Sequence, residues 1–208
     1  DAAHELRTPL TALTLQIQLA ARAESVEERA IALDRMEQGV RRATRLVQQL
    51  LTMARLDPEA AQKPAAPTDL AAVATAVVDE LRPLAAQKSI LLDVDARTPA
   101  WVLGQDDALR SLLTNLVDNA IRYTPPGGRV HVSVQPAGAR VQLIVQDNGP
   151  GIPTDELGRV FDRFYRGREA EAGGSGLGLA IVRQIAAMHD AAITLSEGKA
   201  TGGLRAVA

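Results

Sequence analysis

The first 57 residues contain one glycine, Gly39, and one proline, Pro9, so almost nothing in them interrupts a helix. Apolar residues recur there every three or four positions, which is the spacing of one face of an α-helix. The pattern breaks near residues 23–28, where Ser25 can cap a second helix. Residues 1–57 are therefore predicted to form an antiparallel helical hairpin. Because two helices alone bury such a stripe poorly, we expect a homodimer that forms a four-helix bundle.

The hairpin is followed by a change of pattern. Residues 58–67 contain three prolines among alanines and predict a linker or hinge. Beyond it we predict helices at about 70–87, 106–122 and 177–188, and strands at 90–94, 101–103, 130–134, 141–145, 193–196 and 204–207. Residues 68–208 are therefore expected to form an α/β sandwich with mostly antiparallel strands, so the whole chain is α+β.

Composition excludes several classes of function. The 23 basic and 25 acidic residues give a net charge of −2, which argues against a nucleic-acid-binding surface. Without cysteine there is no disulfide, thiol nucleophile or Cys-ligated zinc site. No apolar run approaches the roughly 20 residues of a membrane-spanning helix. Because Asp1 is not an initiator methionine, we expect a fragment whose sensor or membrane part, if it has one, lies upstream.

The first candidate for chemistry is His4, which lies beside Glu5 and one helical turn before Thr8. A neutral imidazole is a competent nucleophile near pH 7, because its reference pKa is about 6.5. A neighbouring carboxylate can fix its tautomer and take its proton. For a lone His-Glu pair, a surface histidine without a function is the favoured interpretation. A zinc site of the His-Glu-x-x-His type is excluded, because Thr8 stands at the second ligand position.

A second candidate lies on the helix predicted at 106–122. Asn115 and Asn119 are four residues apart and share one helix face. Their neutral amide oxygens can ligate a hard cation such as Mg²⁺ while phosphates supply the charge. Arg122 and Tyr123 follow one turn later.

Two glycine-containing segments complete a predicted nucleotide pocket. Asp147 ends an apolar strand and is followed by Gly149 and Gly151, so a carboxylate and an accessible backbone lie together where a flat ring could bind. The run Gly173–Leu179 opens into a helix, whose free N–H groups can bind phosphates. Each segment alone is a weak signal, and no Walker loop occurs. Residues 149–174 are predicted to be a loop that closes over the ligand.

Taken in chain order, these segments resemble the motifs of the histidine kinase family. His4–Leu10 looks like its phosphoacceptor box. The N, G1, F and G2 boxes are matched by Asn115–Tyr123, Asp147–Gly151, Phe161–Arg166 and Gly174–Leu179. The order and spacing cover essentially the whole chain, and five motifs in sequence are far more specific than any one.

The resemblance implies the core of a bacterial sensor histidine kinase of a two-component system, with an ATP-binding domain of the histidine kinase and Hsp90-like type. His4 would be phosphorylated from ATP and Mg²⁺, with Glu5 assisting proton transfer. The phosphoryl group would then pass to an aspartate in the receiver domain of a response regulator. Thr8 matches a position implicated in a phosphatase activity toward that regulator. The implied location is the cytoplasmic part of an inner-membrane protein.

The resemblance also implies roles in nucleotide binding. Asn119 would ligate Mg²⁺ with Asn115 nearby, and Asp147 would bind the adenine amine. Phe161 and Phe164 would anchor the lid by apolar contact. The implied nucleotide-binding residues are Asn115, Asn119, Arg122, Tyr123, Asp147, Gly149, Gly151, Arg166, Gly174, Gly176, Leu177 and Gly178.

Two other functions remain open at this stage. An ATPase of the same superfamily, such as a chaperone or topoisomerase domain, would explain the pocket but not the His4 motif. A dimerising scaffold with an inactive pocket would conflict with the intact Asn119, Asp147 and glycines.

Overall fold

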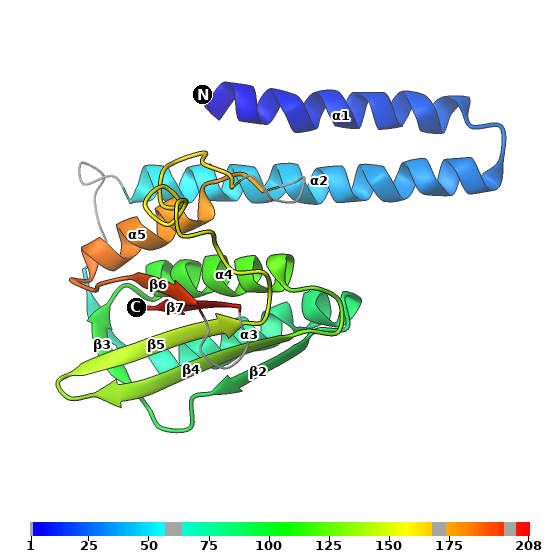
Figure 1. Ribbon diagram of the computed structural model, residues 1–208. Coiled ribbons are helices and arrows are strands. Elements are labelled where there is room, and N and C mark those ends of the chain that lie inside the picture. The colour runs from blue at the N-terminus through cyan, green and yellow to red at the C-terminus, as the bar shows by residue number, and fades with distance from the viewer. Residues whose placement is uncertain (1, 57–63, 168–173, 198–202) are drawn as a thin grey trace. The chain divides into compact units, whose positions relative to one another are not determined.

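A computed structural model describes residues 2–56, 64–167, 174–197 and 203–208 (Figure 1). The chain forms two compact units, Asp1–Asp57 and Pro58–Ala208. The first unit is helical, and the second combines helices with β-sheet.

The first unit is an antiparallel hairpin of α1 (Ala2–Arg22) and α2 (Val26–Arg55) (Figure 1). Ser25 caps α2 as predicted, because its hydroxyl accepts the N–H of Glu28 at 3.0 Å. The Glu28 carboxylate in turn accepts the N–H of Glu24 at 3.0 Å. The first bond satisfies a backbone donor that the start of a helix leaves without an intrahelical partner, and the second holds the chain just before the cap.

The two helices approach closely at a glycine. A Cβ atom on Gly39 would lie 2.8 Å from Cδ2 of Leu13, so a larger residue there would force the Leu13 side chain to move. Gly39 belongs to a row of buried residues on α2, with Ala32 and Leu46 at seven-residue spacing. This heptad spacing keeps one face of α2 against α1 along its length.

A second apolar row on α2 lies beside the buried row and is exposed. Leu33, Val40 and Val47 each follow a residue of the buried row and are 53%, 51% and 42% exposed. Further exposed apolar side chains on the hairpin are Leu10, Leu15, Ile17, Leu19, Val26, Ile31 and Leu51. None of the helices built from described residues is long and apolar enough to cross a membrane.

The second unit is built on a five-stranded sheet in the order β2-β4-β5-β7-β6. Its strands are β2 (Leu91–Asp95), β4 (Arg129–Ala137), β5 (Arg140–Asp147), β6 (Thr194–Glu197) and β7 (Leu204–Val207). β2 pairs with β4 in parallel, and the other neighbours pair antiparallel. A separate antiparallel pair joins β1 (Ala66–Asp69) to β3 (Trp101–Gly104).

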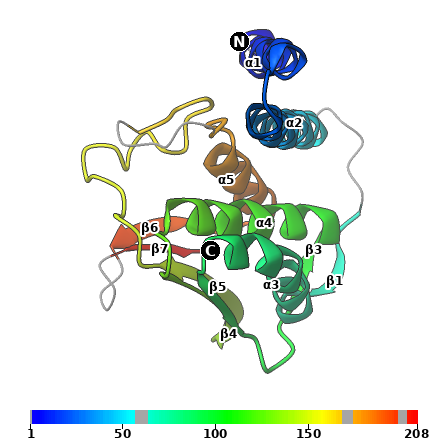
Figure 2. The ribbon, with the colours of Figure 1, turned by 90° about the vertical axis from the view of Figure 1, so that its right-hand side faces the viewer.

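Three helices, α3 (Leu70–Gln87), α4 (Asp106–Tyr123) and α5 (Gly178–Met188), lie along one face of the sheet (Figures 1 and 2). Alternate residues of the central strands point toward them, as the period of two in a strand requires. The core between the layers includes Val130, Val132, Val134, Leu143, Val145, Leu113, Val117, Ile181 and Ile185, all nearly inaccessible.

One sequence prediction needs correction. Ala66 and Pro67 were assigned to the linker, but they belong to β1, where Pro67 pairs with Leu103. β1 pairs only with β3, so a proline without an N–H donor is tolerated there. The other predicted helices and strands occur in the structure, with ends that differ by at most three residues.

Candidate nucleotide-binding site

The C-terminal half of α4 presents Asn115 and Asn119 along one side of the helix. Leu112, Leu116 and Ala120 of the same helix are buried in the core, and this fixes the rotation of α4 about its axis. Both asparagines are half-buried at the edge of that buried face. The Nδ2 group of Asn115 donates to the carbonyl of Ser111 at 2.8 Å, which orients the amide.

Gly178, the first residue of α5, lies against this asparagine pair. A Cβ atom there would lie 3.2 Å from Oδ1 of Asn115 and 3.2 Å from Nδ2 of Asn119. Two segments that are about 60 residues apart in the sequence therefore meet: two side-chain amides and a helix N-terminus. Amide oxygens suit a hard cation, and a helix N-terminus suits an anion.

Arg122 and Tyr123, in the last turn of α4, lie beside the same glycine-rich segment. A Cβ atom on Gly174 would lie 3.5 Å from Nη1 of Arg122 and 3.7 Å from the Tyr123 hydroxyl. The Arg122 side chain is mostly buried, and its Nη2 atom lies 3.8 Å from Oδ2 of Asp118. A positive group and a hydroxyl thus flank the approach to the N-terminus of α5.

Asp147, the last residue of β5, is only 6% exposed. Its Oδ1 atom accepts the N–H of Gly149 at 2.8 Å and that of Leu204 at 3.2 Å. Burial raises the pKa of the carboxyl group, and these two backbone hydrogen bonds partly offset the rise. The carboxylate is a fixed acceptor at the end of the central hairpin.

The loop after Asp147 contacts the end of α4. A Cβ atom on Gly149 would lie 2.7 Å from the carbonyl oxygen of Tyr123, so the two backbones are in direct contact. Gly151 has a φ of +76°, which a glycine adopts without strain. The segments around Asp147 and Gly178 therefore both contact the C-terminal half of α4, which carries Asn119.

A backbone hydrogen bond between Phe164 and Gly176 joins the two ends of the loop before α5. The N–H of Phe164 donates to the carbonyl of Gly176 at 2.9 Å. Phe161 lies under the guanidinium group of Arg183 on α5, 5.8 Å from the ring centroid. Leu177 is fully buried, so only its backbone is available to a ligand.

The remaining predicted residues are placed less completely. His4, Glu5 and Thr8 lie within α1, but their side chains fall outside what the structure describes. Arg166 is exposed, next to Gly167, the last described residue before residue 174.

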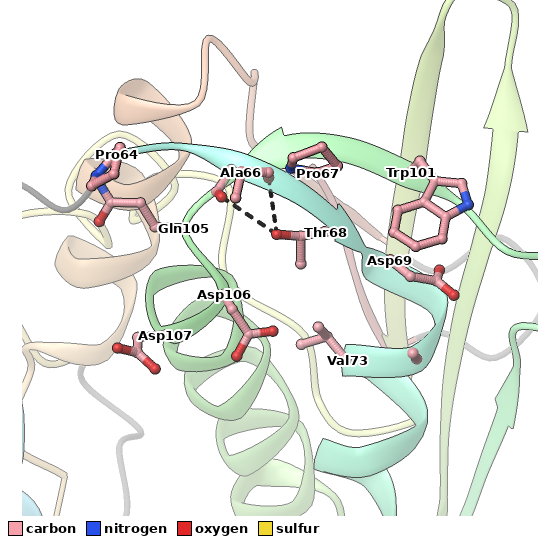
Figure 3. Close-up of a pocket in the computed structure, with 12 residues that line it drawn as sticks. Pro64, Ala66, Pro67, Thr68, Asp69, Val73, Trp101, Gln105, Asp106 and Asp107 are labelled. Carbon is pink, nitrogen blue, oxygen red and sulfur yellow. Dashed lines mark hydrogen bonds between the residues drawn. The ribbon is translucent and has the colours of Figure 1, made fainter.

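A cavity of about 440 Å³ lies elsewhere, between β1, β3 and the start of α4 (Figure 3). Asp106, Asp107, Thr68 and Trp101 are among its lining residues, and Trp101 is 65% exposed. The cavity begins about three helical turns from Asn119 along α4. It is therefore separate from the predicted nucleotide site.

Sequence reasoning missed two contributors to the site. The N–H of Leu204 donates to the Asp147 carboxylate from 57 residues away, and no sequence motif indicates this hydrogen bond. The Lys88 ammonium group binds carbonyls at the end of α4. Nothing in the sequence around Lys88, which follows a predicted helix, indicates that its side chain binds carbonyls more than 30 residues away.

Comparison with known proteins covers both units. Residues 1–59 match the His Kinase A (phospho-acceptor) domain. Residues 104–207 match the family of histidine kinase-, DNA gyrase B-, and HSP90-like ATPases. The sensor protein kinase PmrB of Pseudomonas aeruginosa is 41% identical over 205 residues, which are 98% of this chain and 43% of PmrB. The chain thus spans less than half the length of that relative.

Solved structures agree with the sequence matches. The mycobacterial sensor histidine kinase MprB is 33% identical with a TM-score of 0.62, covering 69% of this chain and 94% of the MprB chain. Full-length ShkA, solved in complex with AMPPNP, is 28% identical with a TM-score of 0.69, covering 98% of this chain and 43% of ShkA. The chain therefore belongs to the bacterial sensor histidine kinases of two-component systems, and it contains the phospho-acceptor and ATPase-like regions of such a kinase.

Proposed function

We propose that this chain binds ATP with Mg²⁺ and transfers the γ-phosphoryl group to His4. The observation that carries the proposal is the meeting of the α5 N-terminus with Asn115 and Asn119, which brings an anion-binding helix end to amides that suit a cation. Family membership supports it, and so does the AMPPNP bound by the related ShkA.

Each end of the nucleotide has a candidate partner. The Asp147 carboxylate accepts the exocyclic amine of adenine, beside the accessible backbone of Gly149. Arg122 and Tyr123 bind the phosphates next to Gly174. The Asn119 amide oxygen holds Mg²⁺, which neutralises phosphate charge when bound.

The proposed transfer needs an in-line nucleophile more than covalent chemistry from the pocket. An imidazole nitrogen of His4 attacks the γ-phosphorus, and a P–N bond forms as the P–O bond to the β-phosphate breaks. ADP leaves with the bonding electron pair, and Glu5 takes the proton that the imidazole releases. A response-regulator aspartate then attacks the same phosphorus, which regenerates His4.

We further propose that the hairpin pairs with a second copy to form a four-helix bundle. Leu33, Val40 and Val47 are at heptad spacing and exposed, as expected for a second seam beside the one that packs on α1.

The decisive experiment is incubation of the chain with γ-labelled ATP and Mg²⁺. We expect acid-labile, alkali-stable label on the protein that His4→Gln removes. Asn119→Asp should also remove it, and Gln135→Glu, the same amide-to-acid change on an exposed part of β4, should not. ATP hydrolysis without labelled protein would instead indicate an ATPase, and absence of nucleotide binding would indicate a scaffold.

Thr8 supports a narrower proposal. It lies one helical turn after His4, where a hydroxyl group can orient a water molecule for hydrolysis of the phosphorylated regulator. Thr8→Ala should slow dephosphorylation of a cognate regulator and leave labelling of His4 intact. Equal dephosphorylation rates would remove Thr8 from this role.

We also propose that this part of the protein works in the cytoplasm, where ATP and response regulators are found. More than half of PmrB lies outside the matched region, which leaves room for a sensor and a membrane anchor in the whole protein. Fractionation of cells that express the full-length protein, with protease protection of this region, tests the assignment.

A further inference from the structure

Lys88 connects two helices of the second unit. It follows α3 as its C-cap residue, and its side chain extends to the far end of α4. The ammonium nitrogen lies 2.6 Å from the carbonyl oxygen of Arg122, 3.1 Å from that of Thr124 and 3.2 Å from that of Ile121. Lys88 is the only lysine in the part of the chain that the structure describes.

These contacts match what the end of a helix lacks. The last carbonyls of an α-helix have no intrahelical donor, and together they form the negative end of the helix dipole. An ammonium group offers three donors and a positive charge, and here it meets three carbonyls at once. The backbone of Lys88 makes a fourth hydrogen bond to this region, because its carbonyl accepts the N–H of Gly127 at 3.1 Å.

The carbonyls of the last turn are divided between two neighbours. Those of Ile121, Arg122 and Thr124 face Lys88, whereas that of Tyr123 faces Gly149 in the loop after Asp147. The turn is thus held between the ammonium group and that loop. The Arg122 and Tyr123 side chains leave this same turn and lie beside Gly174.

We propose that Lys88 is a positioning residue for the phosphates of the bound nucleotide, a proposal that rests on the function inferred above. Its ammonium group touches backbone carbonyls of α4 and acts on the ligand through Arg122 and Tyr123. Without it the last turn of α4 loosens, and the two side chains no longer meet the phosphates together. The adenine contact at Asp147 lies on a separate strand and is retained.

The separation of phosphate and adenine contacts provides the test. We measure the affinities of the full chain for ADP with Mg²⁺ and for adenosine, by competition against a fluorescent nucleotide, at a temperature where thermal melts show each variant to be folded. Lys88→Met should weaken ADP binding about tenfold, as for loss of a charge-assisted contact, and change adenosine binding much less. Lys88→Arg, which keeps charge and donors, should restore most of the ADP affinity.

Arg82→Met is the matched control, because it removes a cation within α3 that also binds a backbone carbonyl. Arg82 donates to Leu92 of β2 at 3.1 Å and does not reach the end of α4 through that bond. The ratio of ADP affinity to adenosine affinity in Arg82→Met should equal that of the wild type.

Two results overturn the proposal: an unchanged ratio in Lys88→Met, or equal losses for both ligands, which would indicate general destabilisation. If Lys88→Met does not fold, Lys88→Gln, which keeps two donors without charge, takes its place, and a wild-type ratio there likewise overturns the proposal. If the wild type itself binds no ADP, the proposed function fails first, which is a distinct outcome.

Discussion

Gly176 and Gly178 stand two residues apart, and a side chain at each would disturb a different part of the structure. Gly176 has a φ of +68°, and a Cβ atom there would lie 2.6 Å from the carbonyl carbon of Phe164. Gly178 has helical backbone within α5, and its missing side chain makes room for Asn115 and Asn119. The first glycine is needed for the loop to form, and the second for the asparagines to keep their places.

Alanine substitutions should separate these two requirements. Gly176→Ala should destabilise the second unit by about 1–2 kcal/mol or more, from the left-handed backbone plus the clash with Phe164. Gly178→Ala should change stability by less than about 1 kcal/mol, because alanine is the better helix former, yet weaken ADP binding. Urea unfolding and ADP titration check both, and normal ADP binding by Gly178→Ala would contradict the site.

Asp147 should show a cost in stability for its proposed role in nucleotide binding. Because burial raises its pKa, the folded protein retains the Asp147 proton to higher pH than the unfolded chain does. The stabilising contribution of this group is therefore fully present below the unfolded pKa of about 3.9, and it is lost as the pH rises through the folded value.

Asp147→Asn keeps an acceptor for Gly149 and Leu204 but removes the buried charge. We expect the variant to be more stable than the wild type at pH 8, with the difference shrinking as the pH falls and the wild-type carboxyl becomes neutral. ADP binding should fall, because an amide presents a donor as well as an acceptor. Thermal unfolding from pH 4 to 8 measures the first effect, and a less stable variant at pH 8 would contradict the charge argument.

At the scale of elements, α4 is held at both ends by side chains from other helices. Lys88 binds its C-terminal carbonyls, and His189, at the end of α5, reaches its N-terminus. Nε2 of His189 accepts the N–H of Gln105 at 3.1 Å, and Nδ1 lies 2.8 Å from the carbonyl of Ile185. The pair of bonds requires a neutral imidazole with its proton on Nδ1.

His189→Ala should destabilise the second unit by about 1–3 kcal/mol, because it leaves a part-buried N–H without its acceptor. ADP affinity measured on the folded variant should stay near the wild-type value, since His189 acts at the end of α4 away from Arg122. Urea unfolding with parallel ADP titration distinguishes the two ends of the helix. A large loss of ADP affinity in His189→Ala would show that the whole helix shifts.

At the scale of the whole molecule, the proposed bundle requires the exposed row on α2 to pair with a second copy. Val40→Glu introduces a charge at the centre of the row, and burying it in a bundle would be unfavourable. We expect light scattering to give about twice 22.1 kDa for the wild type and the monomer mass for this variant. Gln38→Glu, two positions earlier and so about 200° around the helix, should remain dimeric. A monomeric wild type would refute the bundle.

The sequence predicts local features of this molecule better than distant contacts. The helices, most strands and the Ser25 cap follow from periodicity and capping rules that involve neighbours along the chain. The strand that begins at Ala66 is not predicted because two prolines nearby suggest a linker, while its pairing with β3 depends on residues 32 or more positions away. The candidate site shows the same division.

Motifs predict the residues that would meet the nucleotide, because residue types of this chemistry rarely occur together at this spacing. The supports of those residues are ordinary groups with distant partners, such as the ammonium group of Lys88 and the backbone N–H of Leu204. A backbone N–H belongs to nearly every residue, so its partner is determined only by the tertiary fold.

The bond between Asp147 and Leu204 also has a consequence in time. The two residues are 57 positions apart, so at about 5–20 residues per second a ribosome adds Leu204 roughly 3–11 s after Asp147. Until then the nascent chain has the carboxylate without one of its two backbone donors. The helical hairpin is synthesised before the second unit, so it has seconds to fold before the proposed nucleotide site can be completed. The order of synthesis therefore favours folding of the helix that carries His4 before assembly of the pocket proposed to phosphorylate it.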